Sequence, residues 1–226
     1  MRVIFTCFLL WGMQWPARAQ MHKNLLFNGK GWPGTYVLAA DRHQPHTGSL
    51  RVYARELVVY TDQGRTLHYK PEDVYRVQIG RVRYTTAQGF KTKSGLWATK
   101  QTDRLFVEVL DSGQVSLLRY THYVGGHDNS TTTTLATYLL HEASADSVVT
   151  LPINAAGKGR RFQQVLLPYF TSRPDLRQLV EYGAITIDNL PALVRAFNSG
   201  QPFPYTSTGL PAARPLEPGP QGPTGN

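Results

Sequence analysis

The stretch GSLRVYARELVVYTDQGRTLHYKPEDVYRVQI, residues Gly48–Ile79, contains four short apolar runs separated by polar, turn-forming residues. The runs are Leu50–Tyr53, Leu57–Tyr60, Thr66–Tyr69 and Val74–Ile79. Each is rich in β-branched or aromatic residues, which favour strands, and their close spacing is typical of an antiparallel meander. We therefore expect this stretch to form the centre of a β-rich domain.

Alternation within the last run predicts which of its side chains share a face. Val74, Arg76 and Gln78 should point to one side of the strand, and Tyr75 should point to the other with the remaining apolar residues. The alternation changes register at Gly80, so we expect a bulge or a tight turn there.

Further strands are predicted on both sides of the meander. Thr35–Ala40 precedes it, after which Asp41–Thr47 is expected to be a loop. Downstream, Leu105–Leu110 and Val115–Tyr120 form a hairpin whose turn residue Gly113 should supply a left-handed conformation. Both arms of this hairpin are apolar on both faces, which places it in the interior of a sheet.

A final strand pair completes the predicted β-rich region. Leu135–His141 should pair with Ser147–Ile153, which brings the total to roughly nine or ten short strands. Glu108 is the acidic residue in the middle of a predicted strand, and it either faces solvent or pairs with Arg119 on the neighbouring arm.

The period of the apolar pattern changes from two to 3.6 after residue 153. A helix containing Phe162 should kink or end at Pro168, because proline removes a backbone hydrogen bond. A second helix should begin with a capping box at Ser172–Asp175 and end at Gly183, and a third should end at Gly200. The fold class predicted is thus α+β: an antiparallel β sandwich or partly open barrel followed by a small C-terminal helical subdomain.

The two ends of the chain have compositions unlike the rest. Residues 1–19 have a basic start, an apolar run and a small-residue site at Ala17–Ala19, which is typical of a secretory signal peptide. The apolar run is shorter than the roughly 20 residues that span a bilayer, so export is favoured over an anchor helix. Residues 201–226 are rich in proline and glycine, as in a disordered tail. Residues 20–153 and 154–200 are then the β-rich and helical parts.

Charge and cysteine content restrict the chemistry of the exported chain. The predicted signal contains two of the 24 basic residues and none of the 15 acidic ones, which leaves a net charge of +7. It also contains the single cysteine, Cys7, so the mature chain would have no disulfide and no cysteine nucleophile. The positive charge suits anionic partners such as a glycan, a lipid head group or a nucleic acid, and it also favours solubility.

The sequence contains no recognised catalytic or cofactor-binding motif. No serine lies in a nucleophile-elbow pattern, and no glycine-rich loop precedes a helix as in phosphate-binding motifs. A loop from His122 to Asp128 could bring two imidazoles and a carboxylate together for hydrolysis or metal binding, but a solvent-facing polar loop is the simpler interpretation. We expect no metal and no cofactor, and a non-enzymatic structural or adaptor role in the cell envelope.

A basic and aromatic segment is the candidate ligand-binding surface. Its residues are Arg81, Arg83, Lys91, Lys93, Trp97 and Lys100. Alternating positive charge beside an aromatic ring could hold an anionic polymer, in particular an anionic glycan or another envelope component. The alternative is an ordinary solvated sheet face.

Three stretches of the chain resemble a large family of secreted proteins of unknown function from Bacteroidota-type bacteria. They are GTYVLAADRHQPHTGSLRV (Gly34–Val52), YKPEDVYRVQI (Tyr69–Ile79) and RFQQVLLPYFTSRPDLRQLVEYGAITIDNLPALVRAFN (Arg161–Asn198). The resemblance implies an exported, β-rich protein and brings no activity or catalytic residue with it. Relatives often have Gly-Asp-Thr after the first strand, where this chain has Ala40-Asp41-Arg42.

Overall fold

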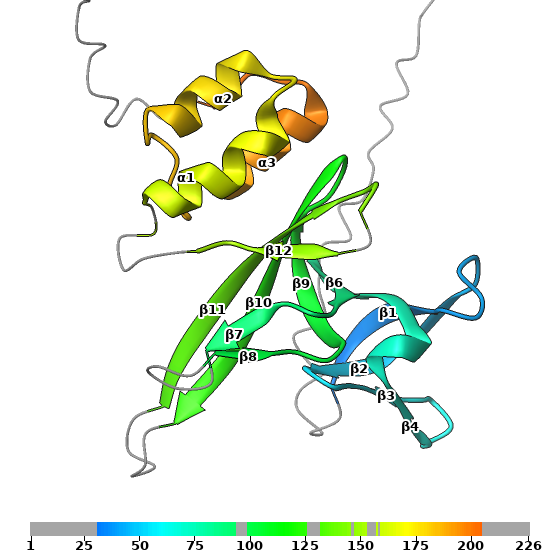
Figure 1. The fold of residues 1–226 in the computed structure, drawn as a ribbon. Coiled ribbons are helices and arrows are strands. Elements are labelled where there is room, and N and C mark those ends of the chain that lie inside the picture. The colour runs from blue at the N-terminus through cyan, green and yellow to red at the C-terminus, as the bar shows by residue number, and fades with distance from the viewer. Residues whose placement is uncertain are drawn as a thin grey trace, which may run out of the picture.

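The computed structural model describes residues 31–93, 99–125, 132–145, 147–152, 157 and 159–204. Twelve strands and three α-helices follow one another along this part of the chain (Figure 1). The strands are β1 (Trp32–Leu38), β2 (Pro45–Tyr53), β3 (Glu56–Tyr60), β4 (Thr66–Tyr69), β5 (Val74–Ile79), β6 (Val82–Ala87), β7 (Lys91–Lys93), β8 (Thr99–Gln101), β9 (Leu105–Asp111), β10 (Val115–Gly125), β11 (Thr132–Glu142) and β12 (Val148–Thr150).

Ten of the strands form one antiparallel sheet in the order β12-β11-β10-β9-β6-β5-β1-β2-β3-β4. The sheet is open, with β12 and β4 at its two edges, and β7 and β8 pair separately as a two-stranded ribbon. The α+β class predicted from the sequence is therefore confirmed, and the strands form an open sheet. The β9–β10 hairpin lies inside the sheet, as its apolar arms predict.

The strands of the central meander match their sequence-predicted bounds closely. β3 begins one residue earlier than predicted, and β4 and β5 have the predicted limits. The clearest difference is β2, which begins at Pro45 because Pro45–Leu50 pairs with β1 along its whole length. The predicted loop is correspondingly shorter. Gly80, with φ of 58°, opens the two-residue turn between β5 and β6, where Ile79 pairs with Val82.

Three helices cover one face of the sheet at the β9–β12 end (Figure 1). They are α1 (Arg160–Leu166), α2 (Pro174–Glu181) and α3 (Leu190–Ser199), and short 3₁₀ turns lie at Pro71–Asp73 and Leu167–Phe170. The α1 helix ends just before Pro168, as predicted. Gly183 and Gly200, both with φ of 69°, end the next two helices as expected.

The predicted capping box at the start of α2 is wrong. The N-cap residue is Arg173, and no side chain caps the helix. Arg173 instead forms a bidentate ion pair with Asp175, with nitrogen–oxygen distances of 3.0 and 2.7 Å. Its guanidinium also donates a hydrogen bond to the carbonyl of Ala196. This clamp joins the start of α2 to the end of α3, so a tertiary contact holds the helix start.

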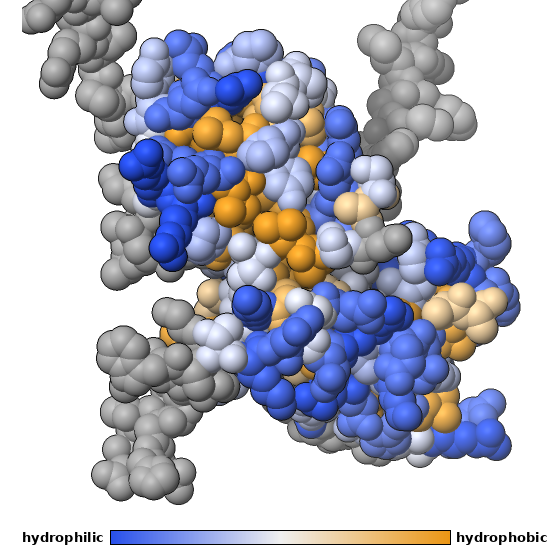
Figure 2. All heavy atoms as spheres, viewed as in Figure 1, coloured by the Kyte–Doolittle hydropathy of each residue, from blue (hydrophilic) through white to orange (hydrophobic). Residues whose placement is uncertain are grey.

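The helices and the sheet share a single apolar core. Val115, Leu117 and Leu140 from β10 and β11 pack with fully buried helical side chains such as Phe162 and Phe170. Figure 2 shows apolar side chains gathered on the helices and at their junction with the sheet, whereas the visible surface around β1–β8 is mostly hydrophilic. A second core lies under the β1–β5 strands, and a third lies around Phe90 on the other face.

Hydrogen bonds join α3 to the sheet at the β9–β10 turn. The Asn198 side chain accepts a hydrogen bond from Val115 N–H at 3.1 Å and donates to the Val115 carbonyl at 2.8 Å and to Asp111 at 3.0 Å. Gly113 is not in a left-handed conformation, so that prediction is wrong. Glycine is needed there because a Cβ atom would collide with Asn198.

Several sequence predictions concern residues outside the described part of the chain. The predicted signal peptide, residues 1–19, and nearly all of the predicted tail belong to this group. Among the residues that are described, no helix has both the length and the apolar character needed to span a membrane.

Candidate ligand-binding groove

The sequence predicted one basic and aromatic surface made by Arg81, Arg83, Lys91, Lys93, Trp97 and Lys100. In the structure Arg81 lies in the β5–β6 turn and Arg83 follows it on β6, whereas Lys91 and Lys100 lie on the β7–β8 ribbon beyond the other end of β6. Trp97 and the Lys93 side chain are outside the described residues. The set is thus divided between two places, and its role in binding stays a prediction.

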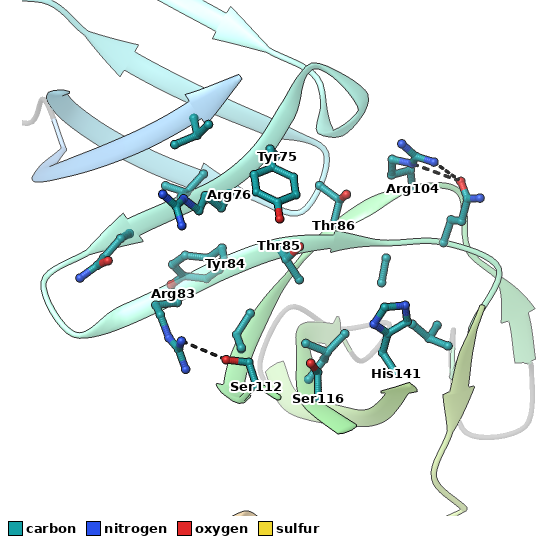
Figure 3. Close-up of a pocket in the computed structure, with 18 of the residues that line it drawn as sticks. Tyr75, Arg76, Arg83, Tyr84, Thr85, Thr86, Arg104, Ser112, Ser116 and His141 are labelled. Carbon is teal, nitrogen blue, oxygen red and sulfur yellow. Dashed lines mark hydrogen bonds between the residues drawn. The ribbon is translucent and has the colours of Figure 1, made fainter. Parts of the chain in front are cut away.

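A groove of about 570 Å³ lies on the face of the main sheet opposite the helices (Figure 3). Ser116 and Leu118 of β10 line this groove, whereas Val115 and Leu117, which alternate with them, face the helices. Residues of β1 and β2 line one end of the groove, and Val148 of β12 lines the other. Strands β1 and β12 are six positions apart in the sheet order, yet both line the same groove. The sheet must therefore curl around the groove.

Three arginines line the groove, and no aspartate or glutamate is among its described lining residues. Arg83 donates from Nη1 to the hydroxyl of Ser112 at 3.1 Å. Arg104 donates from Nε and Nη2 to the amide oxygen of Gln88 at 3.1 and 3.0 Å. Arg76 is exposed and forms no salt bridge with any described residue. The hydrogen-bond partners of Arg83 and Arg104 are neutral, so no carboxylate of the described residues offsets the three positive charges.

Five of the eleven described arginines outside the groove are paired with carboxylates. The pairs are Arg55–Asp103, Arg119–Glu108, Arg173–Asp175, Arg177–Glu181 and Arg195–Asp111. None of these arginines lines the groove. Asp103, Glu108 and Asp111 are each adjacent in sequence to a lining residue, and they form ion pairs with Arg55, Arg119 and Arg195.

The predicted pair between Glu108 and Arg119 is confirmed on the helix-covered face of the sheet. The guanidinium donates from Nη2 and Nε to one carboxylate oxygen, at 2.6 and 2.9 Å. Burial lowers the pKa of Arg119, but the hydrogen bond and charge of Glu108, together with Tyr138, raise it by more. Burial, and then the charge of Glu108, also raise the pKa of Tyr84 beside the pair.

A β-bulge brings Arg76 and Tyr75 to the groove together. Val37 of β1 pairs with Arg76, but the next residue of β1, Leu38, pairs with Val74, so Tyr75 is the extra residue. Val74 is consequently buried in the same core as Val77, and both Tyr75 and Arg76 are exposed. The prediction that Val74 shares a face with Arg76 is therefore wrong. The Arg42 guanidinium lies 4.8 Å from the centre of the Tyr75 ring, at the rim of the groove.

Residues with neutral hydrogen-bonding side chains line the rest of the groove together with apolar residues such as Val109 and Leu118. The hydrogen-bonding residues are Thr35, Gln78, Thr85, Thr86, Gln88, Ser112 and Ser116. His141 also lines the wall, with its Nε2 2.9 Å from the carbonyl oxygen of Ala145. The groove therefore combines fixed positive charges with many uncharged donors and acceptors, an arrangement suited to holding a polar anion.

The His122–Asp128 loop, the alternative catalytic or metal site, is only partly described. His122 is part of β10, half-buried, with its ring stacked on that of Tyr120 at a centroid distance of 5.3 Å. His127 and Asp128 lie outside the described residues. Among the residues that are described, no three His, Cys, Asp or Glu side chains form a group that could hold a metal ion.

Comparison of the chain with protein-family models, with curated proteins and with solved structures found no match. The resemblance to secreted Bacteroidota-type proteins therefore stays a prediction.

Proposed function

We propose that this protein is a binding module that holds an anionic polymer in the groove of its curled sheet. The observation that supports the proposal is the presence of Arg76, Arg83 and Arg104 in a groove without a lining carboxylate. Guanidinium groups bind carboxylate, sulfate and phosphate oxygens in a two-pronged manner, and such charge-assisted hydrogen bonds are among the strongest available to a protein surface.

An ordinary solvated sheet face explains the arrangement less well. The chain has acidic residues to pair with, and five described arginines outside the groove use them, whereas none of the three groove arginines does. Three exposed arginines in one groove without a lining carboxylate give the groove a positive potential, although water and salt screen their mutual repulsion. A polyanion would be attracted to that potential.

The remaining sequence predictions fit this role as proposals. A protein exported by the expected signal peptide would meet anionic polymers of the cell envelope or of the medium. The groove serves a non-enzymatic binding or adaptor function, in which affinity comes from electrostatic attraction and hydrogen bonding.

The test is a comparison of two triple variants that lose the same charge. One is Arg76→Gln, Arg83→Gln, Arg104→Gln. The matched control is Arg65→Gln, Arg161→Gln, Arg177→Gln, three exposed arginines that do not line the groove. Binding of labelled heparin, polyphosphate and oligo-dT is followed by fluorescence anisotropy over a range of salt concentrations, with circular dichroism to verify folding.

We expect the groove variant to lose at least about 30-fold in affinity for the best of these polyanions, since each charged hydrogen bond contributes about 1.5–3 kcal/mol. Its slope of log affinity against log salt should fall by about two, because fewer counterions are released on binding. The control should change affinity by less than about threefold. Equal losses in the two variants would show that net charge alone attracts the polymer, and the proposal would then be wrong.

A second variant compares the groove with the sequence-predicted surface. Arg81→Gln, Lys91→Gln, Lys100→Gln changes three predicted residues that do not line the groove. We expect it to behave like the control. A loss as large as that of the groove variant would move the binding site to the β5–β6 turn and the β7–β8 ribbon.

A further inference from the structure

The spacing of charges along the groove points to a class of ligand. Arg83 lies at one end of β6, and Arg76 is nearby on the neighbouring strand, where Gln78 pairs with Arg83. Gln88, which holds Arg104, follows the other end of β6, where Ala87 pairs with Leu105. Five residues of extended chain separate Arg83 from Gln88, which is roughly 16 Å. The groove thus has two positive ends.

Among the described lining residues, the wall between the two positive ends has no arginine, lysine or carboxylate, and it combines apolar side chains, such as Ala87 and Leu118, with hydroxyl groups. Thr85 lies on β6 between the two ends, and Ser116 of β10 lines the same groove from the other wall (Figure 3). Hydroxyls both donate and accept hydrogen bonds, so they match a ligand segment that carries hydroxyls of its own. A polymer whose charged units lack hydroxyl groups, such as polyphosphate, would leave these hydroxyls without matching partners.

The aromatic side chains of the groove do not form a platform for successive bases. Proteins that bind single-stranded nucleic acid stack several bases on several exposed rings. Among the described lining residues only Tyr75 and Tyr84 are aromatic, and Tyr84 is half-buried against the core under β1–β5. Tyr75 is 44% exposed and has Arg42 over its ring. One ring is enough to stack against one sugar, whose C–H bonds face the negative surface of an aromatic ring.

We infer that the polymer bound in the groove is an acidic polysaccharide, in which anionic groups are separated by hydroxyl-bearing sugar rings. This inference rests on the proposed function and names its ligand class. Arg76 with Arg83 holds one anionic group, Arg104 holds another, and Thr85 and Ser116 contact the sugar hydroxyls between them.

The experiment titrates the folded protein, expressed from the full chain, with four labelled polymers of similar charge number at about 0.15 M salt. The polymers are a polyuronate, heparin, polyphosphate and oligo-dT. We expect the polyuronate or heparin to bind at least tenfold more tightly than both polyphosphate and oligo-dT. The stronger of the two glycans distinguishes a carboxylate from a sulfate as the recognised group.

A double variant, Thr85→Val with Ser116→Ala, separates hydroxyl recognition from charge attraction. It removes both hydroxyl groups and leaves the three arginines in place. We expect about a tenfold loss of glycan affinity, with polyphosphate affinity within twofold of the unmodified protein. Thr121→Val with Thr61→Ala is the control, since neither threonine lines the groove.

The outcomes of this titration separate the two claims. Binding of polyphosphate or oligo-dT as tight as that of the glycans would overturn the inference while leaving an anion-binding groove in place. So would an unchanged glycan affinity in the Thr85–Ser116 variant. No binding of any of the four polymers would overturn both the inference and the proposed function.

Discussion

The two faces of the main sheet use their polar residues in different ways. On the face covered by the helices, Glu108 neutralises Arg119, and Asn198 satisfies the backbone of Val115. On the groove face, Arg83 and Arg104 donate only to a neutral hydroxyl or amide in the contacts described above. The polar groups named on the helix-covered face are paired with each other, whereas the arginines named on the groove face have no carboxylate partner among the described residues.

This difference suggests that the two faces contribute differently to stability and to binding. Buried polar groups must find partners because an unsatisfied one costs about 1–3 kcal/mol. Exposed charges in a groove face water and carry no such requirement. Substitutions on the helix-covered face should therefore lower the free energy of unfolding, and those in the groove should chiefly alter ligand affinity.

The largest stability effect is expected where α3 meets the β9–β10 turn. Gly113→Ala should lower the free energy of unfolding by about 2–3 kcal/mol, because the new methyl group forces Asn198 out of its three hydrogen bonds. Urea denaturation followed by tryptophan fluorescence measures the loss.

Asn198 provides the control for that prediction. Asn198→Ala alone should cost about 1–3 kcal/mol, but it also makes room for the methyl group. Gly113→Ala introduced into the Asn198→Ala protein should then cost less than about 0.5 kcal/mol. Additive losses in the double variant would show that the collision is not the cause.

A second effect, in the core under the β1–β5 strands, depends on pH. The pKa of Tyr36 is raised to about 12, chiefly by burial and then by a hydrogen bond with Tyr69 and by the charge of the Tyr69 side chain. The unfolded chain therefore ionises first, so the stability contributed by Tyr36 is complete below about pH 10 and is lost as the pH rises toward 12. We expect Tyr36→Phe to remove up to about 2 kcal/mol of the stability difference between pH 9 and pH 12.

Denaturation midpoints at several alkaline pH values measure this effect. Tyr182→Phe is the matched control, because Tyr182 is 77% exposed. Its pH dependence should follow that of the unmodified protein. A Tyr36→Phe protein with unchanged alkaline sensitivity would mean that other groups account for the loss.

The smallest effects compare one charge on each face directly. Glu108→Gln leaves Arg119 without its ionic partner in a half-buried position, and should cost about 1 kcal/mol. Arg76→Gln in the groove should change the free energy of unfolding by less than about 0.5 kcal/mol. Thermal denaturation of the two variants tests the contrast, and a greater loss for Arg76→Gln would show that the groove arginines serve the fold.

Local patterns in the sequence determined much of the fold. Alternating β-branched and aromatic residues predict β3, β4 and β5 closely, because each strand needs one buried face and the pleat has a period of two. Pro168, Gly183 and Gly200 mark helix ends through the backbone conformations they allow or forbid. The Glu108–Arg119 pair could also be predicted, since the two residues lie on neighbouring arms of one hairpin, although the register shift between Leu117 and Leu118 is what sets them directly opposite each other.

The groove was decided by tertiary structure. The bulge that exposes Tyr75 beside Arg76 depends on how β5 pairs with β1, which lies more than 30 residues earlier in the chain. Arg104 reaches the same groove only because β6 and β9 pair and the sheet curls. Curvature and long-range register arise from contacts among all the strands, so residues that are far apart and unremarkable in the sequence can meet at one site. The sequence indicated a positively charged, β-rich protein; which of its charges meet depended on the bending of the sheet.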